Sequence, residues 1–235
     1  YSVTITDNNN CDVDTVFSIA EPPVITATGS VTNVICNGDS NGTATINPSG
    51  GVSPYYYQWD ANTNNQTSQT ATGLSGNTYS VTISDDNGCF MITSQTLAEA
   101  SVFFINNITG NNITCYGDGD GSAIINPGGG ELPYNFLWDT NANNQTTQTA
   151  TGLSGGTFSF SITDSYGCTI DSAVTIIEPV LLTSTSDSVN ITCNGDGDGT
   201  ATVSPIGGSF PYSFLWDAAA NNQTSQTATG LSGGI

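Results

Sequence analysis

The sequence SPYYYQWDANTNNQTSQTATGLSG, at residues 53–76, decides the fold of this chain because it recurs twice more almost unchanged. It returns as LPYNFLWDTNANNQTTQTATGLSG at residues 132–155 and as FPYSFLWDAAANNQTSQTATGLSG at residues 210–233. Successive copies begin 79 and 78 residues apart. A fixed period of this length indicates a tandem array of small domains.

Within each repeat, β-branched and aromatic residues alternate with polar ones, as at residues 43–47 and 79–84. A period of two is typical of half-buried β-strands, and no helical stripe appears. The same pattern predicts further strands at residues 24–30, 55–59, 67–74 and 90–97. Seven or so short strands around a central Trp predict an all-β fold of tandem immunoglobulin-like β-sandwich repeats of about 79 residues. We interpret Asn62 to Asn65 as a hairpin turn.

One aromatic residue in this pattern has a second expected role. The segment from Leu74 to Tyr79 is similar to a tyrosine corner, in which the ring hydroxyl bonds to backbone upstream of its strand. Phe158 takes the place of Tyr79 in the next repeat, so that bond cannot be common to all repeats.

The sequence begins and ends inside a repeat, since residues 1–7 match residues 79–85 and residues 231–234 match the start of a strand segment at 153–156. Pro or small residues interrupt the strand pattern at residues 21–23, 98–100 and 178–179. We therefore expect a C-terminal part of one repeat at 1–23, complete repeats at 24–100 and 101–179, and an N-terminal part of the following repeat at 180–235.

The charge of the chain excludes several functional classes. It has 20 acidic residues and no Lys, Arg or His, which gives a formal net charge of -20. Binding to nucleic acid or to an anionic membrane surface requires cationic side chains, so we expect neither partner. No apolar stretch is long enough to span a bilayer, which argues against direct membrane insertion.

Enzyme chemistry is also disfavoured, because the usual general base and the Schiff-base amine are missing. Asp60, Asp139 and Asp217 each follow a Trp and could pair with a second carboxylate, as in glycoside hydrolysis. No cation or imidazole is present to tune their pKa values. We expect no enzyme activity, no catalytic residue and no required cofactor.

Each repeat contains two cysteines, which in an exported array predict disulfides. Pairing within the repeat joins Cys36 to Cys89 and Cys115 to Cys168, and leaves Cys11 and Cys193 to cysteines outside this sequence. Each such bond closes a 53-residue spacing and stabilises the fold by roughly 4 kcal/mol. A second scheme joins neighbouring repeats: if the number of strands between Cys36 and Cys89 is odd, they lie at opposite ends of the sandwich and Cys36 meets Cys168. Free buried thiols are a third possibility.

Short acidic loops recur after Cys36, Cys115 and Cys193 and resemble the start of a calcium loop. Their candidate Ca²⁺ ligands are Asp39, Asn41, Asp118, Asp120, Asp196 and Asp198. The loops lack the terminal bidentate Glu, and Asp and Gly are also the ordinary residues of tight turns. Both a calcium site and a simple turn are compatible with the sequence.

The order of short motifs within a repeat resembles the SprB repeat. The segments are Cys36-Asn37-Gly38-Asp39, Gly42-Thr43-Ala44, Gly50-Gly51, Pro54-Tyr55, Trp59, Gly73-Leu74, Tyr79-Ser80-Val81 and Asp86-Asn87-Gly88-Cys89. That family builds long cell-surface adhesins of gliding Bacteroidetes, which the type IX secretion system exports. The resemblance implies an extracellular, cell-surface filament segment with a structural and adhesive function in gliding or attachment.

The expected partners are neighbouring repeats and, through unpaired edge strands without Lys, laterally associated copies. Three Asp-Ser/Thr segments are similar to the O-glycosylation motif of Bacteroidetes and would place sugars on Thr15, Ser172 and Ser188. The alternative function is an array of carbohydrate-binding modules that recognise surface polysaccharide. In that case the ligand would contact Tyr55 to Tyr57, Tyr134 and Tyr212, because the three Trp residues are expected in the core.

Overall fold

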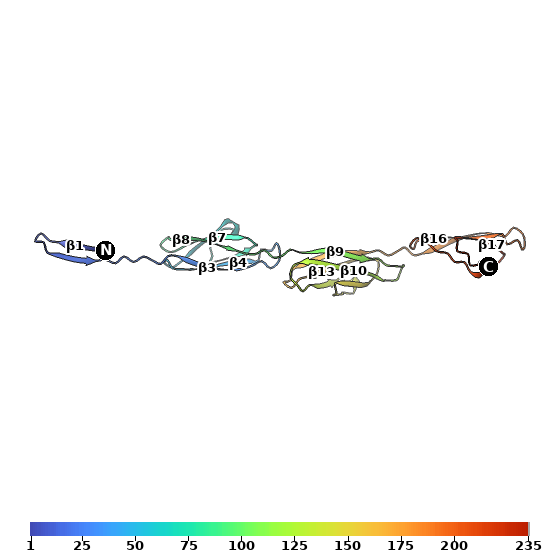
Figure 1. The fold of residues 1–235 in the computed structure, drawn as a ribbon, viewed down its shortest axis with the longest axis horizontal. Coiled ribbons are helices and arrows are strands. Elements are labelled where there is room, and N and C mark those ends of the chain that lie inside the picture. Colours follow the sequence, from blue (N-terminus) through green and yellow to red (C-terminus); the bar gives the residue numbers. More distant parts are fainter. Residues whose placement is uncertain (235) are drawn as a thin grey trace. The chain divides into compact units, whose positions relative to one another are not determined.

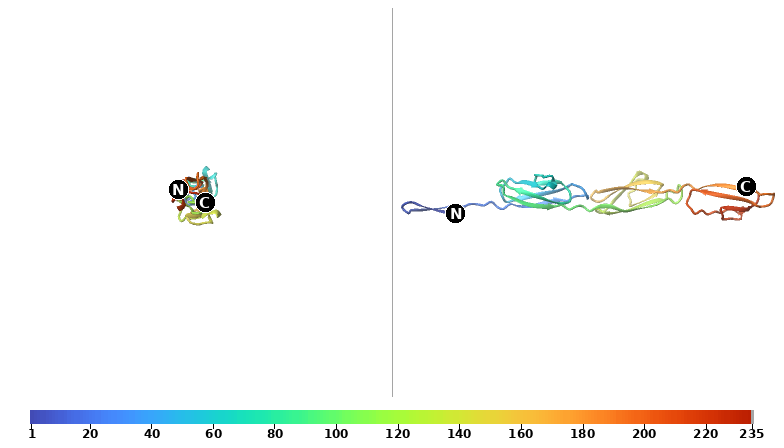
Figure 2. Two further views of the ribbon diagram at one scale, coloured as in Figure 1. Left: turned by 90° about the vertical axis from the view of Figure 1, so that its right-hand side faces the viewer. Right: turned by 90° about the horizontal axis from the view of Figure 1, so that it is seen from above.

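The computed structural model describes residues 1–234, which contain β-strands and three short 3-10 helices but no α-helix. The chain divides into two compact units, Tyr1–Val102 and Phe103–Ile235. The first unit contains a hairpin and one β-sandwich, and the second contains a β-sandwich and a separate three-stranded sheet (Figures 1 and 2). No helix among the described residues is long and apolar enough to cross a membrane.

The first sandwich has two antiparallel three-stranded sheets. One consists, in spatial order, of β3 (Thr26–Thr32), β4 (Gly42–Ser49) and β6 (Thr70–Leu74). The other consists of β5 (Tyr56–Trp59), β7 (Thr78–Ser84) and β8 (Phe90–Thr96). The expected all-β, immunoglobulin-like sandwich is confirmed, with six strands in each complete repeat.

The second sandwich repeats this topology. Its sheets are β9 (Phe103–Asn111), β10 (Gly121–Gly129) and β12 (Thr149–Leu153), and β11 (Asn135–Trp138), β13 (Gly156–Thr163) and β14 (Thr169–Ile176). The hairpin in the first unit is β1 (Ser2–Thr6) with β2 (Asp12–Val16), and the third sheet in the second unit is β15 (Thr183–Val189), β16 (Gly199–Ile206) and β17 (Thr227–Leu231).

A buried Trp lies at the centre of each complete sandwich, as expected from the sequence. Trp59 and Trp138 are each 1% exposed. The Trp59 indole Nε1–H donates to the Ser68 carbonyl oxygen at 2.9 Å, and Trp138 makes the matching bond to Thr147 at 3.0 Å. Each core draws its buried residues from its own repeat. The polar edge of the indole is therefore satisfied while its rings fill the space between the sheets.

The segment after β5 is not the hairpin turn that its Asn residues suggested. It forms the 3-10 helix η1 (Ala61–Thr63), followed by Asn64 and Asn65 with φ values of 60° and 56°. Tyr56 lies opposite Ser84, whereas Leu74 lies opposite Gly42. The chain therefore leaves β5 in one sheet, crosses to the other sheet and continues in the same direction along β6.

This crossing gives each complete repeat two chemically different ends. The chain enters at the proximal end, where the Gly51 N–H donates to the Pro23 carbonyl oxygen at 2.7 Å. From there the chain makes five traversals between the ends, along β3, β4, the combined path of β5 and β6, β7 and β8, and three of these, from β4 to β7, lie between Cys36 and Cys89. The chain therefore leaves after β8 at the opposite, distal end, where the Gly76 N–H donates to Glu99 Oε2 at 3.0 Å.

The predicted tyrosine corner is confirmed in the first sandwich. The Tyr79 hydroxyl donates to the Ser75 carbonyl oxygen at 3.0 Å, and its side chain is 2% exposed. The equivalent ring of Phe158 is also buried but carries no hydroxyl.

We expect Tyr79→Phe to lower the unfolding free energy of the first repeat by about 1 kcal/mol, because a buried hydrogen bond is lost while the ring remains. Hydrogen exchange of the intact chain, followed by mass spectrometry, should show faster exchange at residues 24–100 and no change at 101–179. Tyr56→Phe is the control because Tyr56 is exposed. Equal exchange in the two variants would contradict the role of the corner.

Candidate functional site

The two ends of each repeat hold the cysteines and most of the acidic groups with defined hydrogen bonds. At the proximal end, Asp85 is 3% exposed. Its carboxylate accepts hydrogen bonds from the backbone N–H groups of Val52, Asn87 and Cys89 at 2.9, 3.1 and 2.8 Å. Three donors replace the water that burial removes, which allows a carboxylate to be buried without a cation.

The same arrangement recurs in the second sandwich. Asp164 is buried and accepts from the N–H groups of Glu131, Tyr166 and Cys168 at 3.0, 2.9 and 2.9 Å. In the hairpin, Asp7 accepts from the N–H groups of Cys11 and Asn9, and these bonds, the one from Cys11 most of all, lower its pKa. The sequence analysis did not identify this recurring Asp, although it stands four residues before the proximal cysteine in each copy and could have been found by that spacing.

At the distal end, one Glu connects the last strand to two loops of its own repeat. Glu99 accepts from the Gly38 N–H at 2.7 Å and from the Gly76 N–H at 3.0 Å. In the second sandwich, Glu178 accepts from the Gly117 N–H at 2.8 Å. These residues were noticed only as boundary markers, yet they fix the loop that carries the distal cysteine.

The six proposed calcium ligands lie in these distal loops, and the second member of each pair already holds its loop together. Asn41 accepts from the Ile35 N–H at 3.2 Å, while Asp120 and Asp198 accept from the Thr114 and Thr192 N–H groups at 2.9 Å. Among residues 1–234, no group of three or more His, Cys, Asp or Glu side chains is arranged to hold a metal. The geometry favours the turn interpretation, and Ca²⁺ binding stays a prediction.

Hydrogen bonds from Thr114 to Asp120, and from Thr192 to Asp198, lower the pKa of both carboxyl groups below the ordinary value of 3.8. A carboxyl group whose pKa is lower in the folded state stabilises the fold at pH values above 3.8. This stabilisation is lost as the pH falls through the folded-state pKa. Asn41 supplies a non-titrating amide at the same position in the first repeat.

We expect acidification below pH 3.8, the ordinary pKa value, to disrupt the loop bond of Asp120 before it affects that of Asn41. The amide resonance of Thr114 should shift with pH in an NMR titration, whereas that of Ile35 should not show this step. Asp120→Asn should abolish the titration step at Thr114. An identical step at both amides would show that general unfolding, rather than this carboxylate, causes it.

The cysteines do not pair within repeats as predicted. Cys36 and Cys168 each take part in a disulfide, whereas Cys11, Cys89, Cys115 and Cys193 carry free, exposed thiols. Cys36 lies in the distal loop and Cys89 in the proximal turn of one sandwich, separated by the length of β4, about 25 Å. A disulfide joins Cα atoms about 6 Å apart, so Cys36–Cys89 cannot form. Cys115–Cys168 is wrong for the same reason.

The wrong pairing was predicted because a hairpin at Asn62 to Asn65 would make the number of strand traversals between Cys36 and Cys89 even. The observed number is three, the condition under which the alternative scheme links neighbouring repeats. That scheme stays a prediction, as do the partners of Cys11 and Cys193 outside this sequence.

Non-reducing peptide mapping should therefore yield no peptide that joins Cys36 to Cys89 or Cys115 to Cys168. We expect Cys36 to be found with Cys168, the proximal cysteine of the following repeat. Since trypsin has no cleavage site in this chain, a protease specific for acidic or aromatic residues is needed. Recovery of a Cys36–Cys89 peptide from folded protein would contradict the observed topology.

The acids that follow each Trp have structural partners. Asp60 accepts from the Asn62 N–H at 3.0 Å and from the Ser80 N–H at 2.7 Å, and so caps η1 and ties it to β7. Asp139 caps η2 (Thr140–Ala142) and accepts from the Ser159 N–H at 2.7 Å. Asp217 caps η3 (Ala218–Ala220). Each of the three acids therefore caps the 3-10 helix that follows it.

The proposed ligand-contacting tyrosines differ in their environments. Tyr55, Tyr134 and Tyr212 each donate their hydroxyl to a Gly carbonyl oxygen five residues earlier. Burial raises the pKa of Tyr57, and Tyr56 is exposed. Only Tyr56 in this group presents most of its ring to solvent.

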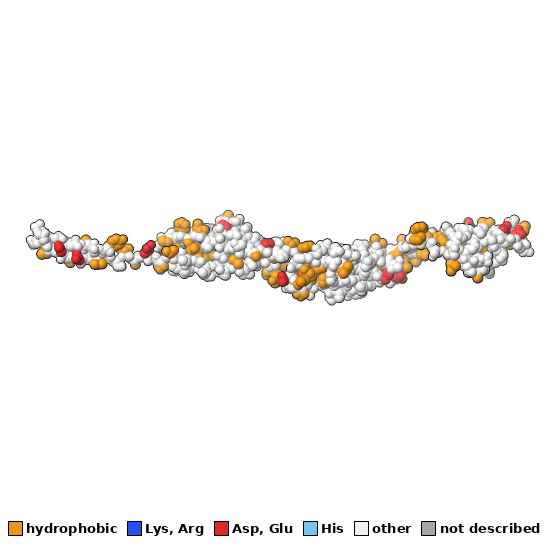
Figure 3. Space-filling view, viewed as in Figure 1, with side chains coloured by type: hydrophobic (Ala, Val, Ile, Leu, Met, Phe, Trp, Pro, Cys, Tyr) orange, Lys and Arg blue, Asp and Glu red, His pale blue; other side chains and the backbone are white. Residues whose placement is uncertain are grey.

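The three proposed glycosylation residues also differ in exposure. Thr15 and Ser188 are exposed on β2 and β15, whereas Ser172 is half-buried on β14. Their glycosylation stays a prediction. Figure 3 shows scattered acidic side chains on a largely uncharged surface, with hydrophobic side chains on the hairpin and beside β16.

The SprB repeat family matches the chain at three tandem positions, residues 28–64, 107–143 and 185–221. Each match covers the first half of a repeat and ends just after its 3-10 helix. No curated protein matches the chain in sequence.

Several solved structures are similar in fold. Three N-terminal domains of the bacteriophage RB49 outer capsid protein Hoc share 15% identity over 79% of this chain and 69% of that chain, with a TM-score of 0.41. A C-terminal fragment of intimin, solved with the intimin-binding domain of its translocated receptor, shares 18% identity over 70% and 67%, with a TM-score of 0.38. The eight N-terminal Ig domains of Down syndrome cell adhesion molecule share 10% identity over 91% and 35%, with a TM-score of 0.38.

Proposed function

We propose that this chain, which carries three tandem SprB repeats, is a structural and adhesive segment of a long extracellular surface filament used in cell attachment or gliding. SprB repeats are typical of cell-surface adhesins, and a disulfide is consistent with an extracellular location. Export by the type IX secretion system is part of the same proposal. The observation that carries it is the placement of chain entry and chain exit at opposite ends of each complete sandwich.

Because the chain enters and leaves each sandwich at opposite ends, every added repeat lengthens the filament. A sandwich whose strands have eight or nine residues advances the chain by about 25 to 30 Å. Because each core is made within one repeat, every added repeat contributes its own stability and its own length. The array therefore serves to extend the filament away from the cell surface and to repeat its adhesive contacts along its length.

The strand direction also suits a segment under tension. Force applied through the two ends acts along β3 and β8, so that β3 must slide past β4, with which it forms seven residue pairs. Loss of the strand then requires several hydrogen bonds to break together. We propose that the repeats bear load in this shearing geometry and perform no enzymatic reaction.

Single-molecule stretching of the intact chain under reducing conditions should show two extension steps of roughly 25 nm, one for each complete repeat. Ile46→Ala removes buried side-chain volume from the first core and should lower the force of one step only. Val31→Ala, at a more exposed position on β3, is the control. Extension without resolved steps would contradict a load-bearing role.

One observation favours the alternative, a carbohydrate-binding array. On the outer face of the first sandwich, Tyr56, Ser84 and Phe90 lie side by side across β5, β7 and β8, and both aromatic rings are exposed. The second sandwich has Asn135, Thr163 and Thr169 in this row. If a glycan binds the chain and the double substitution Tyr56→Ala and Phe90→Ala abolishes this binding, the result would support the alternative for the first repeat alone.

A further inference from the structure

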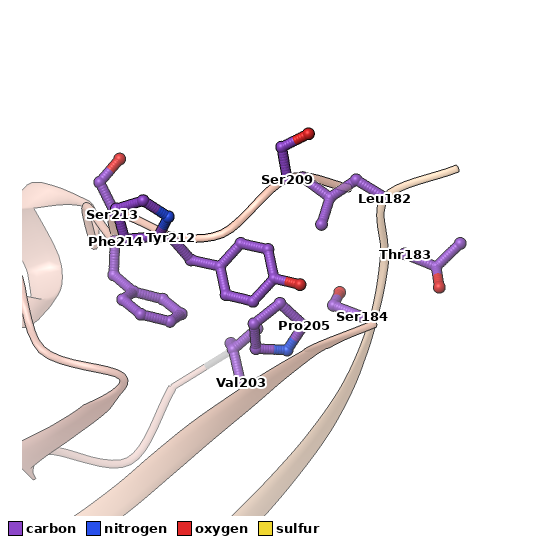
Figure 4. A pocket seen from close by; sticks show the side chains of 10 residues that line it. Leu182, Thr183, Ser184, Val203, Pro205, Ser209, Tyr212, Ser213 and Phe214 are labelled. Carbon is purple, nitrogen blue, oxygen red and sulfur yellow. The ribbon is translucent and has the colours of Figure 1, made fainter. Parts of the chain in front are cut away.

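The groove beside β16 is lined by apolar and hydroxyl side chains, with Tyr212 and Phe214 projecting above Val203 and Pro205 (Figure 4). No carboxylate, amide or thiol of the described residues lines this groove. The proximal turn of the first repeat, in contrast, exposes an amide next to a glycine at Asn87-Gly88. This pair has a chemistry of its own, because an Asn side chain can react with the backbone nitrogen that follows it.

The reaction is an attack of the glycine backbone nitrogen on the side-chain carbonyl carbon of Asn. A new bond between these two atoms closes a cyclic succinimide, the side-chain nitrogen leaves as ammonia, and the proton of the backbone nitrogen passes through solvent to the ammonia. Water then opens the ring at one of its carbonyl carbons and leaves either Asp or isoaspartate. Glycine favours the attack because no Cβ shields its nitrogen and its backbone is free to rotate.

The first complete repeat contains three Asn-Gly pairs, which begin at Asn37, Asn41 and Asn87. The first pair is held by the residues that follow β8. The Asn37 side-chain amide donates to the Ala100 carbonyl oxygen at 3.0 Å, and the Gly38 N–H donates to Glu99 Oε1 at 2.7 Å. Both of these bonds must break before the amide carbon and the glycine nitrogen can meet.

The second pair is held within the distal loop and by β4. Asn41 Oδ1 accepts from the Ile35 N–H at 3.2 Å, and Asn41 Nδ2 donates to Asp39 Oδ2 at 3.1 Å. Gly42 is buried and lies opposite Leu74 on β6. The amide is therefore fixed at both of its polar atoms, and solvent base has no access to the glycine nitrogen.

Asn87 lacks these restraints. Its side chain is exposed and makes no hydrogen bond within residues 1–234. Gly88 is exposed as well, has a φ value of 78° and has open space around the position of a Cβ. Its N–H donates to the Asp85 carbonyl oxygen at 3.0 Å, which is a single bond in a solvent-exposed turn. Base can therefore reach the nitrogen, and the amide is free to approach it.

We propose that Asn87 is a site of spontaneous deamidation, at which the first repeat acquires Asp and isoaspartate while Asn37 and Asn41 stay intact. The two products differ in their effect on the buried Asp85. Asp leaves the backbone unchanged, whereas isoaspartate routes it through the side chain and lengthens it by one methylene. The Cys89 N–H, which donates to Asp85 Oδ1 at 2.8 Å, is then displaced. A buried carboxylate that loses a donor destabilises the fold, so isoaspartate loosens the proximal end of this repeat.

Incubation of the intact chain at neutral and mildly alkaline pH, followed by peptide mass spectrometry, tests the site. Fragmentation that distinguishes isoaspartate from Asp should show conversion at Asn87 several times faster than at Asn37 and Asn41. The rate should rise with pH because base removes the proton of the attacking nitrogen. In the urea-unfolded chain the three rates should become similar. Asn87→Gln should abolish the change at this position, since a longer amide closes a ring less readily.

The second repeat offers a matched gain of the same site. Its proximal turn has Tyr166, which is 64% exposed, followed by Gly167 with a φ value of 89°. The Gly167 N–H donates to the Asp164 carbonyl oxygen at 3.1 Å, as in the first repeat. Tyr166→Asn should therefore deamidate at a rate close to that of Asn87. Conversion of Asn37 or Asn41 as fast as Asn87 in the folded chain, or no conversion in Tyr166→Asn, would overturn the proposal.

Hydrogen exchange of the aged chain tests the structural consequence. The Val52 N–H also donates to Asp85, so it should exchange faster in molecules that carry isoaspartate. Asn87→Asp reproduces the other product without the longer backbone and should keep the exchange of the original chain. Unchanged exchange at Val52 in the isoaspartate form would contradict the loosening of the proximal end.

Discussion

The bond between Asp60 and the two segments around it determines much of the architecture of the repeat. Its carboxylate caps η1 and also accepts from the Ser80 N–H on β7. These contacts hold the chain at the point where it changes sheets halfway along the sandwich. Because the chain then continues in its original direction, the number of traversals is odd and the chain leaves opposite to where it entered. Gln66 strengthens the crossing by bonding to both backbone groups of Thr72.

Acidic side chains in this protein act mainly as acceptors for backbone N–H groups. Asp85 satisfies three such donors while buried, and Glu99 joins two loops at the distal end. A chain without Lys, Arg or His has no ion pairs with side chains, so the polypeptide backbone supplies the compensating dipoles. This explains how a net charge of -20 is compatible with ordered loops and a packed core.

The repeat period, the strands and the Trp core could be predicted from sequence because each depends on local alternation or on self-similarity. The tyrosine corner was also predictable, since its donor and acceptor are four residues apart. The sheet change after Trp59 was not, because Asn64 and Asn65 adopt positive φ values that a hairpin turn would also require. Which sheet the next strand joins depends on contacts distant in sequence, and the cysteine pairing depended on that choice. Asp85 was missed because an acid in a turn is ordinarily exposed.

The self-contained cores have a consequence for how such a protein changes over generations. Ile46 and Ile125 lie in separate cores that are each complete within about 79 residues. Gain or loss of one whole repeat in register would therefore add or remove one core without altering the packing of another. Populations could therefore vary the length of the encoded polymer while leaving every domain intact.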